Sequence, residues 1–500
     1  MNVVLLSTYE LGRQPFGLAS PAAWLRRAGA EVTAADLGRQ PLPADAVRAA
    51  DLIAFYIPMH TATRLAAQAL RVIWQLNPGA HLCFYGLYAP MNEAYLRSLG
   101  ARTILGGEFE DGLVKLVERL RGENKSFVGA GLQPGRKTGQ EIGAFRSDAT
   151  AERRSRRRRE APEVPQPEPL VSLDRLAFIP PDRSGLPPLA RYAQLIVPSG
   201  APACPEGANE VSTRRVGYTE ASRGCKHLCR HCPIVPVYNG VFRIVPREVV
   251  LADIRQQVAA GAEHITFGDP DFFNGPGHAL EIVRALHREF PALTYDVTIK
   301  VEHLLKHSER LATLRETGCL FVTTAVESID DAVLARLDKG HTRADFLEVV
   351  RRCRDAGLAL SPTFVPFHPW TTLDGYLELL NTLAELELIE SVAPIQLAIR
   401  LLIPSGSKLL ELSEVAAMVG EFDPAALVYP WTHADPRVDA LQRRVQETVH
   451  VAEHEKRSRS EIFDTLWSLA HEAAGRPWHR VSEPRLARAA IPYLNEPWYC

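Results

Sequence analysis

The chain has 500 residues, of which 46% are hydrophobic and 23% are charged. These are ordinary values for a globular protein, and this length favours two to four domains. The formal net charge of −2 gives no overall field that would attract nucleic acid or an anionic membrane. No stretch reaches the roughly 18 apolar residues that span a bilayer, and the first residues lack the pattern of a signal peptide. We therefore expect a cytoplasmic protein with no membrane partner.

Short apolar runs alternate with helical patterns from residue 1 to about residue 122. This alternation is typical of parallel strands joined by crossover helices, and it predicts a five-stranded doubly wound, flavodoxin-like α/β domain over residues 1–122. The ligand of such a domain lies beyond the carboxyl ends of its strands. We expect the small, polar loop from Tyr9 to Gly17 and the turn at Gly106 and Gly107 to face that ligand.

The apolar periodicity stops between residues 123 and 168, where an Arg-rich run and a Pro-rich run follow each other. Too little apolar surface is available there to offset the chain entropy, so we predict a disordered linker. The Arg run leaves nucleic-acid binding as an alternative, but no aromatic residue interleaves it for base stacking. A connecting segment, residues 169–214, leads to the next domain.

A second alternation of strands and helices covers residues 215–415. It contains six β/α repeats, which predicts a partial barrel rather than the closed barrel of eight repeats. The remaining residues, 416–500, show helical stretches broken by Pro and Trp. We expect this mainly helical extension to cap the barrel.

Three of the eight cysteines, Cys225, Cys229 and Cys232, lie within eight positions, directly after the first predicted barrel strand. Thiolates at this spacing suit zinc or an iron-sulfur cluster. A structural zinc site needs a fourth ligand, which His227 or His231 would have to supply from between the cysteines. An iron-sulfur cluster in which one iron has no cysteine ligand explains the missing fourth ligand better, because that iron can bind a substrate or cofactor.

The segment GYTEASRGCKHLCRHCP, with its CxxxCxxC spacing after the first barrel strand, resembles the signature of the radical S-adenosylmethionine (SAM) superfamily. The resemblance implies a 4Fe-4S cluster whose uncapped iron chelates SAM, and one-electron cleavage of SAM to a 5′-deoxyadenosyl radical. It also implies an electron donor such as flavodoxin or ferredoxin. His231 stands where the family usually has an aromatic residue.

The same resemblance extends to other barrel residues. Asp269 and Asp271 follow the second strand, where the family holds the amino group of SAM; the alternative is that they cap the following helix. Glu327 ends the fourth strand and is expected to approach SAM and to take part in catalysis, with Lys339 following as a further cofactor-binding candidate. Arg400 is a weaker candidate for cofactor binding, and the alternative is that it forms a buried ion pair.

A doubly wound domain followed by such a barrel resembles the cobalamin-binding group of the superfamily, which places the corrin ring between the two domains. Residues 1–122 contain no Asp-x-His-x-x-Gly motif, so we expect cobalamin to bind without a lower histidine ligand. We interpret His60 and His81 as ordinary polar histidines.

The printed sequence ends in PYLNEPWYC, at Cys500. It resembles a radical SAM group with a Cys-Cys-Ala-Glu-Pro or Cys-selenocysteine-Ala-Glu-Pro tail. One hypothesis is that the sequence stops at a selenocysteine codon and that Cys500 is catalytic; the alternative is a native terminus with a free thiol. We expect Cys83, Cys319 and Cys353 to be buried core residues, and Cys204 has no assignment.

The leading functional prediction is a cobalamin-dependent methyltransferase that acts on an unactivated carbon or phosphorus of a small-molecule or peptide substrate. The second is radical SAM oxidation, rearrangement or sulfur/selenium chemistry that uses a terminal Cys or Cys-selenocysteine pair. From a different class, a zinc-stabilised nucleic-acid-binding protein would use the Arg run.

Overall fold

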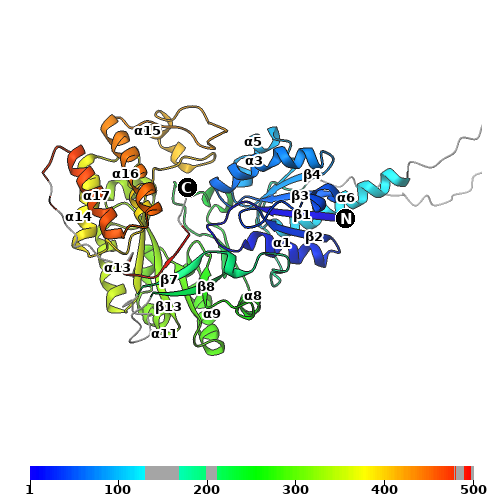
Figure 1. Cartoon of the computed structure of the whole chain (residues 1–500), viewed down its shortest axis with the longest axis horizontal. Coiled ribbons are helices and arrows are strands. Elements are labelled where there is room, and N and C mark those ends of the chain that lie inside the picture. The colour runs from blue at the N-terminus through cyan, green and yellow to red at the C-terminus, as the bar shows by residue number, and fades with distance from the viewer. Residues whose placement is uncertain (130–167, 199–210, 478, 480–488, 497–500) are drawn as a thin grey trace, which may run out of the picture.

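The computed structural model describes residues 1–129, 168–198, 211–477, 479 and 489–496 (Figure 1). Most of the predicted linker, with its Arg run, lies outside the described residues, as do Cys204 and Cys500. Within the described ranges, no helix is both long enough and apolar enough to cross a membrane.

The amino-terminal domain is a parallel sheet covered by helices on both faces. Its strands lie in the order β2-β1-β3-β4-β5-β6, and the first five have the order of a flavodoxin-like sheet. Val3 and Leu5 of β1 pack with α1 and α6, whereas Val4 and Leu6 pack with α2, α3 and α5 on the opposite face. The predicted doubly wound fold is therefore confirmed. The elements are β1 (Asn2–Ser7), α1 (Phe16–Arg27), β2 (Glu31–Asp36), α2 (Ala44–Ala49), β3 (Leu52–Tyr56), α3 (His60–Leu76), β4 (His81–Tyr85), α4 (Tyr88–Met91), α5 (Glu93–Ser98), β5 (Thr103–Gly107), α6 (Phe109–Gly129) and β6 (Val171–Ser172).

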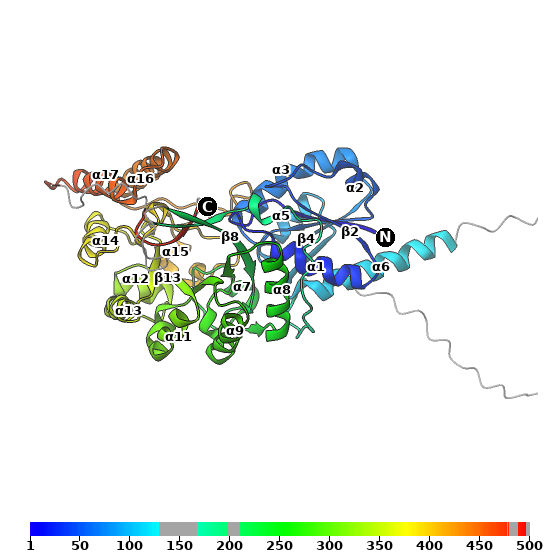
Figure 2. The same cartoon turned by 60° about the horizontal axis from the view of Figure 1, so that its bottom comes forward.

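The second domain is a curled half-barrel sheet that lies beside the first domain (Figures 1 and 2). Its order is β14-β13-β12-β11-β8-β7-β15, in which β8, β11, β12, β13 and β14 are parallel, and β7 pairs antiparallel with both β8 and β15 (Tyr493–Leu494) at one edge. Strands β9 and β10 form a separate antiparallel pair. The predicted partial β/α barrel is confirmed. Its elements are β7 (Gln194–Val197), β8 (Ser212–Thr219), β9 (Ser222–Gly224), α7 (Val235–Tyr238), β10 (Phe242–Ile244), α8 (Arg247–Ala259), β11 (His264–Phe267), α9 (Pro276–Glu289), β12 (Thr294–Thr298), α10 (Val301–Lys306), α11 (Leu311–Glu316), β13 (Cys319–Glu327), α12 (Asp331–Leu337), α13 (Arg343–Asp355), β14 (Ala359–Phe364) and α14 (Leu373–Glu385).

The sixth predicted barrel strand, residues 395–404, is present only as a parallel bridge between Phe367 and Arg400. The Leu401 N–H donates to the Phe367 carbonyl at 2.8 Å. A 3-10 helix, η4 (Pro394–Leu397), begins the segment, and Pro404 ends it without an N–H to donate. A continuous ladder therefore does not form here.

The carboxyl-terminal extension contains α15 (Ser413–Ala416), α16 (Pro436–His454), α17 (Arg459–Ala473) and β15 (Tyr493–Leu494). Helix α17 begins with a capping box in which Ser458 and Glu461 each accept a backbone N–H of the other residue. Val445 of α16 and Phe463 of α17 belong to the same core cluster as the outer face of the barrel sheet. Strand β15 pairs with β7 and so brings the end of the chain to the edge of the barrel.

Candidate active site

The three clustered cysteines follow β9 on one loop. Gly224, which ends β9, has a φ of +71°, and a Cβ there would lie 2.5 Å from the Val241 carbonyl oxygen, so the turn into the loop requires glycine. Cys225 and Cys229 are buried and Cys232 is partly buried. Burial raises the pKa of Cys225 and raises that of Cys232 to about 12, and neighbouring cysteines add to both shifts. Thiolates at these positions would therefore need a bound cation or cluster to stabilise them.

Two buried lysines lie beside these thiols. The Lys300 Nζ is 3.8 Å from Cys229 Sγ. Lys339 is 3% exposed, and although burial opposes its charge, Glu327 and the nearby Cys229 and Cys232 raise its pKa. Cationic donors near cluster sulfurs stabilise negative charge there and help to set the reduction potential of a cluster.

Glu327 ends β13 at a register irregularity, and its φ is +68°. A positive φ at a non-glycine residue is strained, and such strain is concentrated at functional sites. The Lys339 Nζ donates to Glu327 Oε1 at 3.2 Å, and His231 Nε2 lies 3.1 Å from the same oxygen. Burial disfavours the carboxylate, but Lys339 and His231 outweigh it and hold the pKa of Glu327 at about 2. The structure thus brings Glu327 and Lys339 together and links both to the cysteine loop through His231.

Asp269 lies at the predicted strand end, but both of its carboxylate oxygens already accept hydrogen bonds. The Ser222 hydroxyl donates to Oδ1 at 2.6 Å, and the Ala221 N–H donates to Oδ2 at 2.9 Å. Burial raises the pKa of Asp269 to about 7. These contacts fasten the turn between β8 and β9, just before the cysteine loop.

Asp271 caps the 3-10 helix η2 (Phe272–Asn274) by accepting the Phe273 N–H at 3.1 Å. Asp271 therefore caps a helix, as the alternative prediction proposed, but it uses only one of its two carboxylate oxygens for this. The other oxygen faces His303 and His227. Burial opposes ionisation, but the two histidines outweigh it and hold the pKa of Asp271 at about 2.

Arg400 lies apart from these groups, in an ion pair on the barrel side of α16. Its Nη1 donates to Asp439 Oδ1 at 2.6 Å and its Nη2 to the Trp431 carbonyl at 2.8 Å. The guanidinium also stacks on the Trp431 ring at 3.6 Å. These contacts favour the structural ion pair over a cofactor-binding role.

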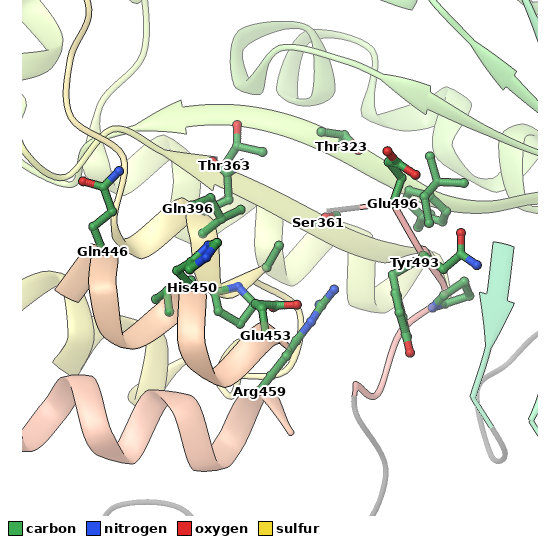
Figure 3. Close-up of a pocket in the computed structure, with 18 of the residues that line it drawn as sticks. Thr323, Ser361, Thr363, Gln396, Gln446, His450, Glu453, Arg459, Tyr493 and Glu496 are labelled. Carbon is green, nitrogen blue, oxygen red and sulfur yellow. The ribbon is translucent and has the colours of Figure 1, made fainter. Parts of the chain in front are cut away.

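A cavity of about 440 Å³ lies between the inner face of the half-barrel and the carboxyl-terminal extension (Figure 3). The sheet contributes Asp296 from β12, Thr323 from β13, and Ser361 and Thr363 from β14. Facing them are Gln446, His450 and Glu453 of α16, Arg459 of α17, and Tyr493 and Glu496 from the end of the chain. Both the volume and the mixed polar and apolar walls are typical of a small-molecule site.

A second cavity, of about 230 Å³, lies between the two domains at the carboxyl ends of the amino-terminal strands. Both turns predicted to face a ligand contribute to it, through Glu10, Arg13 and Gly107 among others. Glu10 Oε2 and Arg13 Nε are buried and have no hydrogen-bond partner among the described residues, and nor does Ser7 Oγ at the end of β1. Arg13 lines both cavities, so they meet at its side chain. None of the described residues that line the second cavity is a histidine.

A buried charge cluster joins the two domains beside this cavity. Arg223 donates to Glu110 Oε1 at 2.6 Å, to Glu220 Oε2 at 2.7 Å and to Glu108 Oε2 at 3.3 Å. Burial raises the pKa of Glu108 to about 7, against the attraction of Arg223. Because Arg223 precedes Cys225 by two positions, this cluster couples the domain interface to the cysteine loop.

The comparisons with known proteins agree with this arrangement. Residues 219–383 match the model of the Radical SAM superfamily. The chain carries a radical SAM domain. With it, the predictions of an enzyme and of a 4Fe-4S cluster and SAM as its cofactors are confirmed. The match favours a cluster over zinc at the three cysteines, whereas nucleic-acid binding stays a prediction, because the Arg run lies outside the described residues.

Similar proteins include ribosomal protein uS12 methylthiotransferase RimO from Geobacter sulfurreducens, 25% identical over 177 residues. That match covers 34% of this chain and 39% of RimO, so the chain spans about two-fifths of the length of this relative. The radical SAM methyltransferase TsrM from Kitasatospora setae, solved with cobalamin and a [4Fe-4S] cluster, has a TM-score of 0.61 and 15% identity over 95% of this chain and 99% of TsrM. The cobalamin-dependent SAM radical enzyme OxsB, with aqua-cobalamin and SAM, has a TM-score of 0.61 and 13% identity over 90% of this chain and 66% of OxsB. These likenesses show a shared two-domain fold.

Several site residues were absent from the sequence-based prediction. The polar inner face of the barrel sheet could have been predicted from the sequence, because Asp296 and Thr298 alternate with the outward-facing Tyr295 and Val297 in β12. His303, Lys300 and the carboxylates around Arg223 carry no such signal, since only the folded chain shows that they face the cysteine loop or its flanks. The catalytic role of Cys500 stays a prediction, because Cys500 lies outside the described residues.

Proposed function

We propose that this radical SAM enzyme is a cobalamin-dependent methyltransferase that acts on an unactivated carbon or phosphorus of a small-molecule or peptide substrate. The observation that carries the proposal is the meeting of two cavities at Arg13, one in the barrel lumen and one between the domains beside the cysteine loop. TsrM and OxsB, whose names include methyltransferase and cobalamin-dependent enzyme, share the fold and support the same interpretation.

In this proposal Cys225, Cys229 and Cys232 hold the cluster. Lys300 and Lys339 stabilise the charge of the ligating sulfurs and protect them from protonation. When bound, the cluster supplies the electron that cleaves SAM and cobalamin supplies the methyl group for transfer. The protein's own contribution is to position these groups and to exclude water.

Glu327 and Lys339 form the polar end of the proposed SAM site. The pKa of Glu327 is about 2, so its carboxylate is ionised at neutral pH, and it lies at the end of β13, 3.1 Å from His231 of the cysteine loop, on a strained backbone. It is suited to accept a hydrogen bond from an ammonium or ribose hydroxyl group. Asp269 acts here as a positioning residue, because its two oxygens hold the turn that precedes the cysteines.

The space between the domains fits cobalamin in its chemistry. A corrin ring carries amide side chains, and the unpartnered Glu10 Oε2 and Arg13 Nε, whose side chains line this cavity, offer an acceptor and a donor to them. Burial raises the pKa of Glu10 well above its ordinary value, so its carboxyl group is also able to donate. The cofactor would be held without a histidine from the described residues of this wall.

The lumen cavity would hold the substrate. Its walls offer hydroxyl groups from Thr323, Ser361 and Thr363, and charged groups from Glu453 and Arg459 on the opposite side (Figure 3). Such walls suit a molecule with both amide or hydroxyl groups and opposite charges, which is typical of amino acids and peptides.

The test is anaerobic reconstitution of the full chain with iron, sulfide, hydroxocobalamin and SAM carrying a labelled methyl group. We expect one cluster, one bound cobalamin, 5′-deoxyadenosine, and label in cobalamin and then in product. Cys225→Ser, Cys229→Ser and Cys232→Ser should each abolish cluster absorption and SAM cleavage, whereas Arg400→Leu should retain both. A wild-type cluster that cleaves SAM but neither binds cobalamin nor transfers label would refute methyl transfer and leave the second, oxidative or sulfur-based chemistry.

A further inference from the structure

A second group of metal-ligating side chains lies next to the cysteine loop and has no part in the proposed reaction. It consists of His227, Asp271 and His303, whose nearest ligand atoms all lie within 4.8 Å of one another. His227 lies on the loop between Cys225 and Cys229, Asp271 follows β11, and His303 lies on α10 after β12. The three side chains therefore converge from three different elements.

The converging atoms lack satisfied hydrogen bonds. His227 Nε2, Asp271 Oδ2 and His303 Nδ1 are all buried without a hydrogen-bond partner of acceptable geometry among the described residues. Asp271 is fully buried and His303 is 1% exposed. Among the described residues these three atoms have no ion-pair neighbours other than one another, with Asp271 Oδ2 2.6 Å from His303 Nδ1 and 3.6 Å from His227 Nε2. Buried polar atoms in native proteins nearly always have a partner, and a cation between the three would give each of them one.

The distances suit a small cation after a slight adjustment. Asp271 Oδ2 lies 3.6 Å from His227 Nε2 and 2.6 Å from His303 Nδ1. Bonds of about 2.0–2.1 Å around a tetrahedral zinc place ligand atoms about 3.3 Å apart. His303 and Asp271 would have to separate by less than about 1 Å, and the two histidine nitrogens, which lie within 4.8 Å of each other, would have to settle at the same spacing around the cation.

The surroundings also resemble those of metal sites. Glu302 Oε2 lies 3.5 Å from His227 Nδ1, on the side of the ring away from Asp271. A carboxylate in that position favours the tautomer with a proton on Nδ1 and leaves Nε2 free to bind a metal. Two imidazoles and one carboxylate form the donor set of known zinc and non-haem iron sites with an open fourth position.

We propose that His227, Asp271 and His303 bind a divalent first-row cation of the zinc class, in a site separate from the three cysteines. The cation would fasten the cysteine loop to the ends of β11 and β12. Its role is structural, since it ties the loop between the first two cysteines to the barrel. The proposal does not depend on methyl transfer or on cobalamin.

The test separates this cation from the cluster. The triple variant Cys225→Ser/Cys229→Ser/Cys232→Ser keeps the His/Asp group but cannot hold a cluster, and we expect it to bind one Co²⁺ with the visible d–d absorption of a His/carboxylate site. Adding His303→Gln or Asp271→Asn should abolish that absorption. Glu302→Gln should weaken binding by roughly 10–100-fold, as loss of an orienting carboxylate does. The matched control, His454→Gln at the exposed end of α16, should change nothing.

A second measurement covers the case in which the triple variant does not fold. The reconstituted wild-type enzyme should retain about one zinc per chain in addition to cluster iron, and His303→Gln should lose the zinc while keeping the iron. Absence of zinc from the wild-type enzyme, or Co²⁺ binding that His303→Gln and Asp271→Asn leave unchanged, would overturn the proposal. In that event the three residues form only a hydrogen-bonded clamp. Iron content and 5′-deoxyadenosine formation report separately on the radical SAM function.

Discussion

The ion pair between Lys339 and Glu327 provides a quantitative test of the site. Lys339→Met removes the cation but keeps most of the side-chain volume, so the carboxylate remains buried with His231 as its remaining neighbour. Both side chains are at most 10% exposed, and solvent therefore screens the pair weakly. We expect a large loss of stability from the single substitution and a much smaller loss from the double variant Lys339→Met/Glu327→Gln.

The size of the loss follows from the pKa of Glu327. Lys339 and His231 together hold the pKa at about 2, against an ordinary value of 4.5, and this difference corresponds to a contribution on the order of 3 kcal/mol. Because the pKa is lowered in the folded state, this contribution is complete above about pH 4.5 and is lost as the pH falls towards 2. Breaking a buried pair costs about 3–5 kcal/mol in other proteins, which agrees with this value. For a domain of this size, about 3 kcal/mol corresponds to a fall of roughly 6–12 °C in melting temperature.

The assay is thermal unfolding of the cluster-free chain at pH 7, followed by tryptophan fluorescence, for the wild type, the two single variants and the double variant. We expect Lys339→Met to melt well below the wild type, and the addition of Glu327→Gln to recover most of the difference in melting temperature. Equal melting temperatures for Lys339→Met and the double variant would refute this expectation. That result would mean that the Glu327 carboxylate, once it has lost Lys339, does not destabilise the folded chain.

Four further predictions concern other parts of the molecule. Ser361→Trp, which fills the lumen cavity, should abolish methylated product but leave uncoupled SAM cleavage, as measured by 5′-deoxyadenosine formation. Arg400→Leu should cost about 1.5–3 kcal/mol through loss of its bond to Asp439, with SAM cleavage per folded chain unchanged. Phe364→Ala should cost about 3–5 kcal/mol in denaturant unfolding because Phe364 is fully buried, whereas Leu347→Ala, at a 37% exposed site, should change stability by less than about 0.5 kcal/mol. Burial raises the pKa of Asp269 to about 7. The protonated carboxyl group therefore contributes stability that is complete below about pH 3.9 and is lost as the pH rises through 7. The free energy of unfolding measured across this range should fall less steeply for Asp269→Asn than for the wild type.

The sequence predicted those parts of the site whose partners lie close together along the chain. Cys225, Cys229 and Cys232 needed only their spacing and their place after a strand. The two turns of the amino-terminal domain were predicted for the same reason, because strand ends of a parallel sheet share one edge. In contrast, β6 and β15 were not predicted. Each strand has only two residues, which is too short for a periodic signal, and each pairs with a strand more than 60 residues away along the chain.

Asp269 and Asp271 show why positions were easier to predict than roles. Both follow β11, and the sequence gives each the same two possibilities, a cap or a ligand to SAM. In the folded chain Asp269 accepts bonds from Ala221 and Ser222, almost fifty positions earlier, whereas Asp271 faces His303, more than thirty positions later. Their pKa values move in opposite directions. Burial raises that of Asp269 to about 7 against the hydrogen bonds from Ser222 and Ala221, whereas His227 and His303 outweigh burial at Asp271 and lower its pKa to about 2. Two identical side chains that are two residues apart thus titrate differently, because only Asp271 lies against two histidines. Of the two, only Asp271 converges with two imidazoles, the donor set of the proposed cation site.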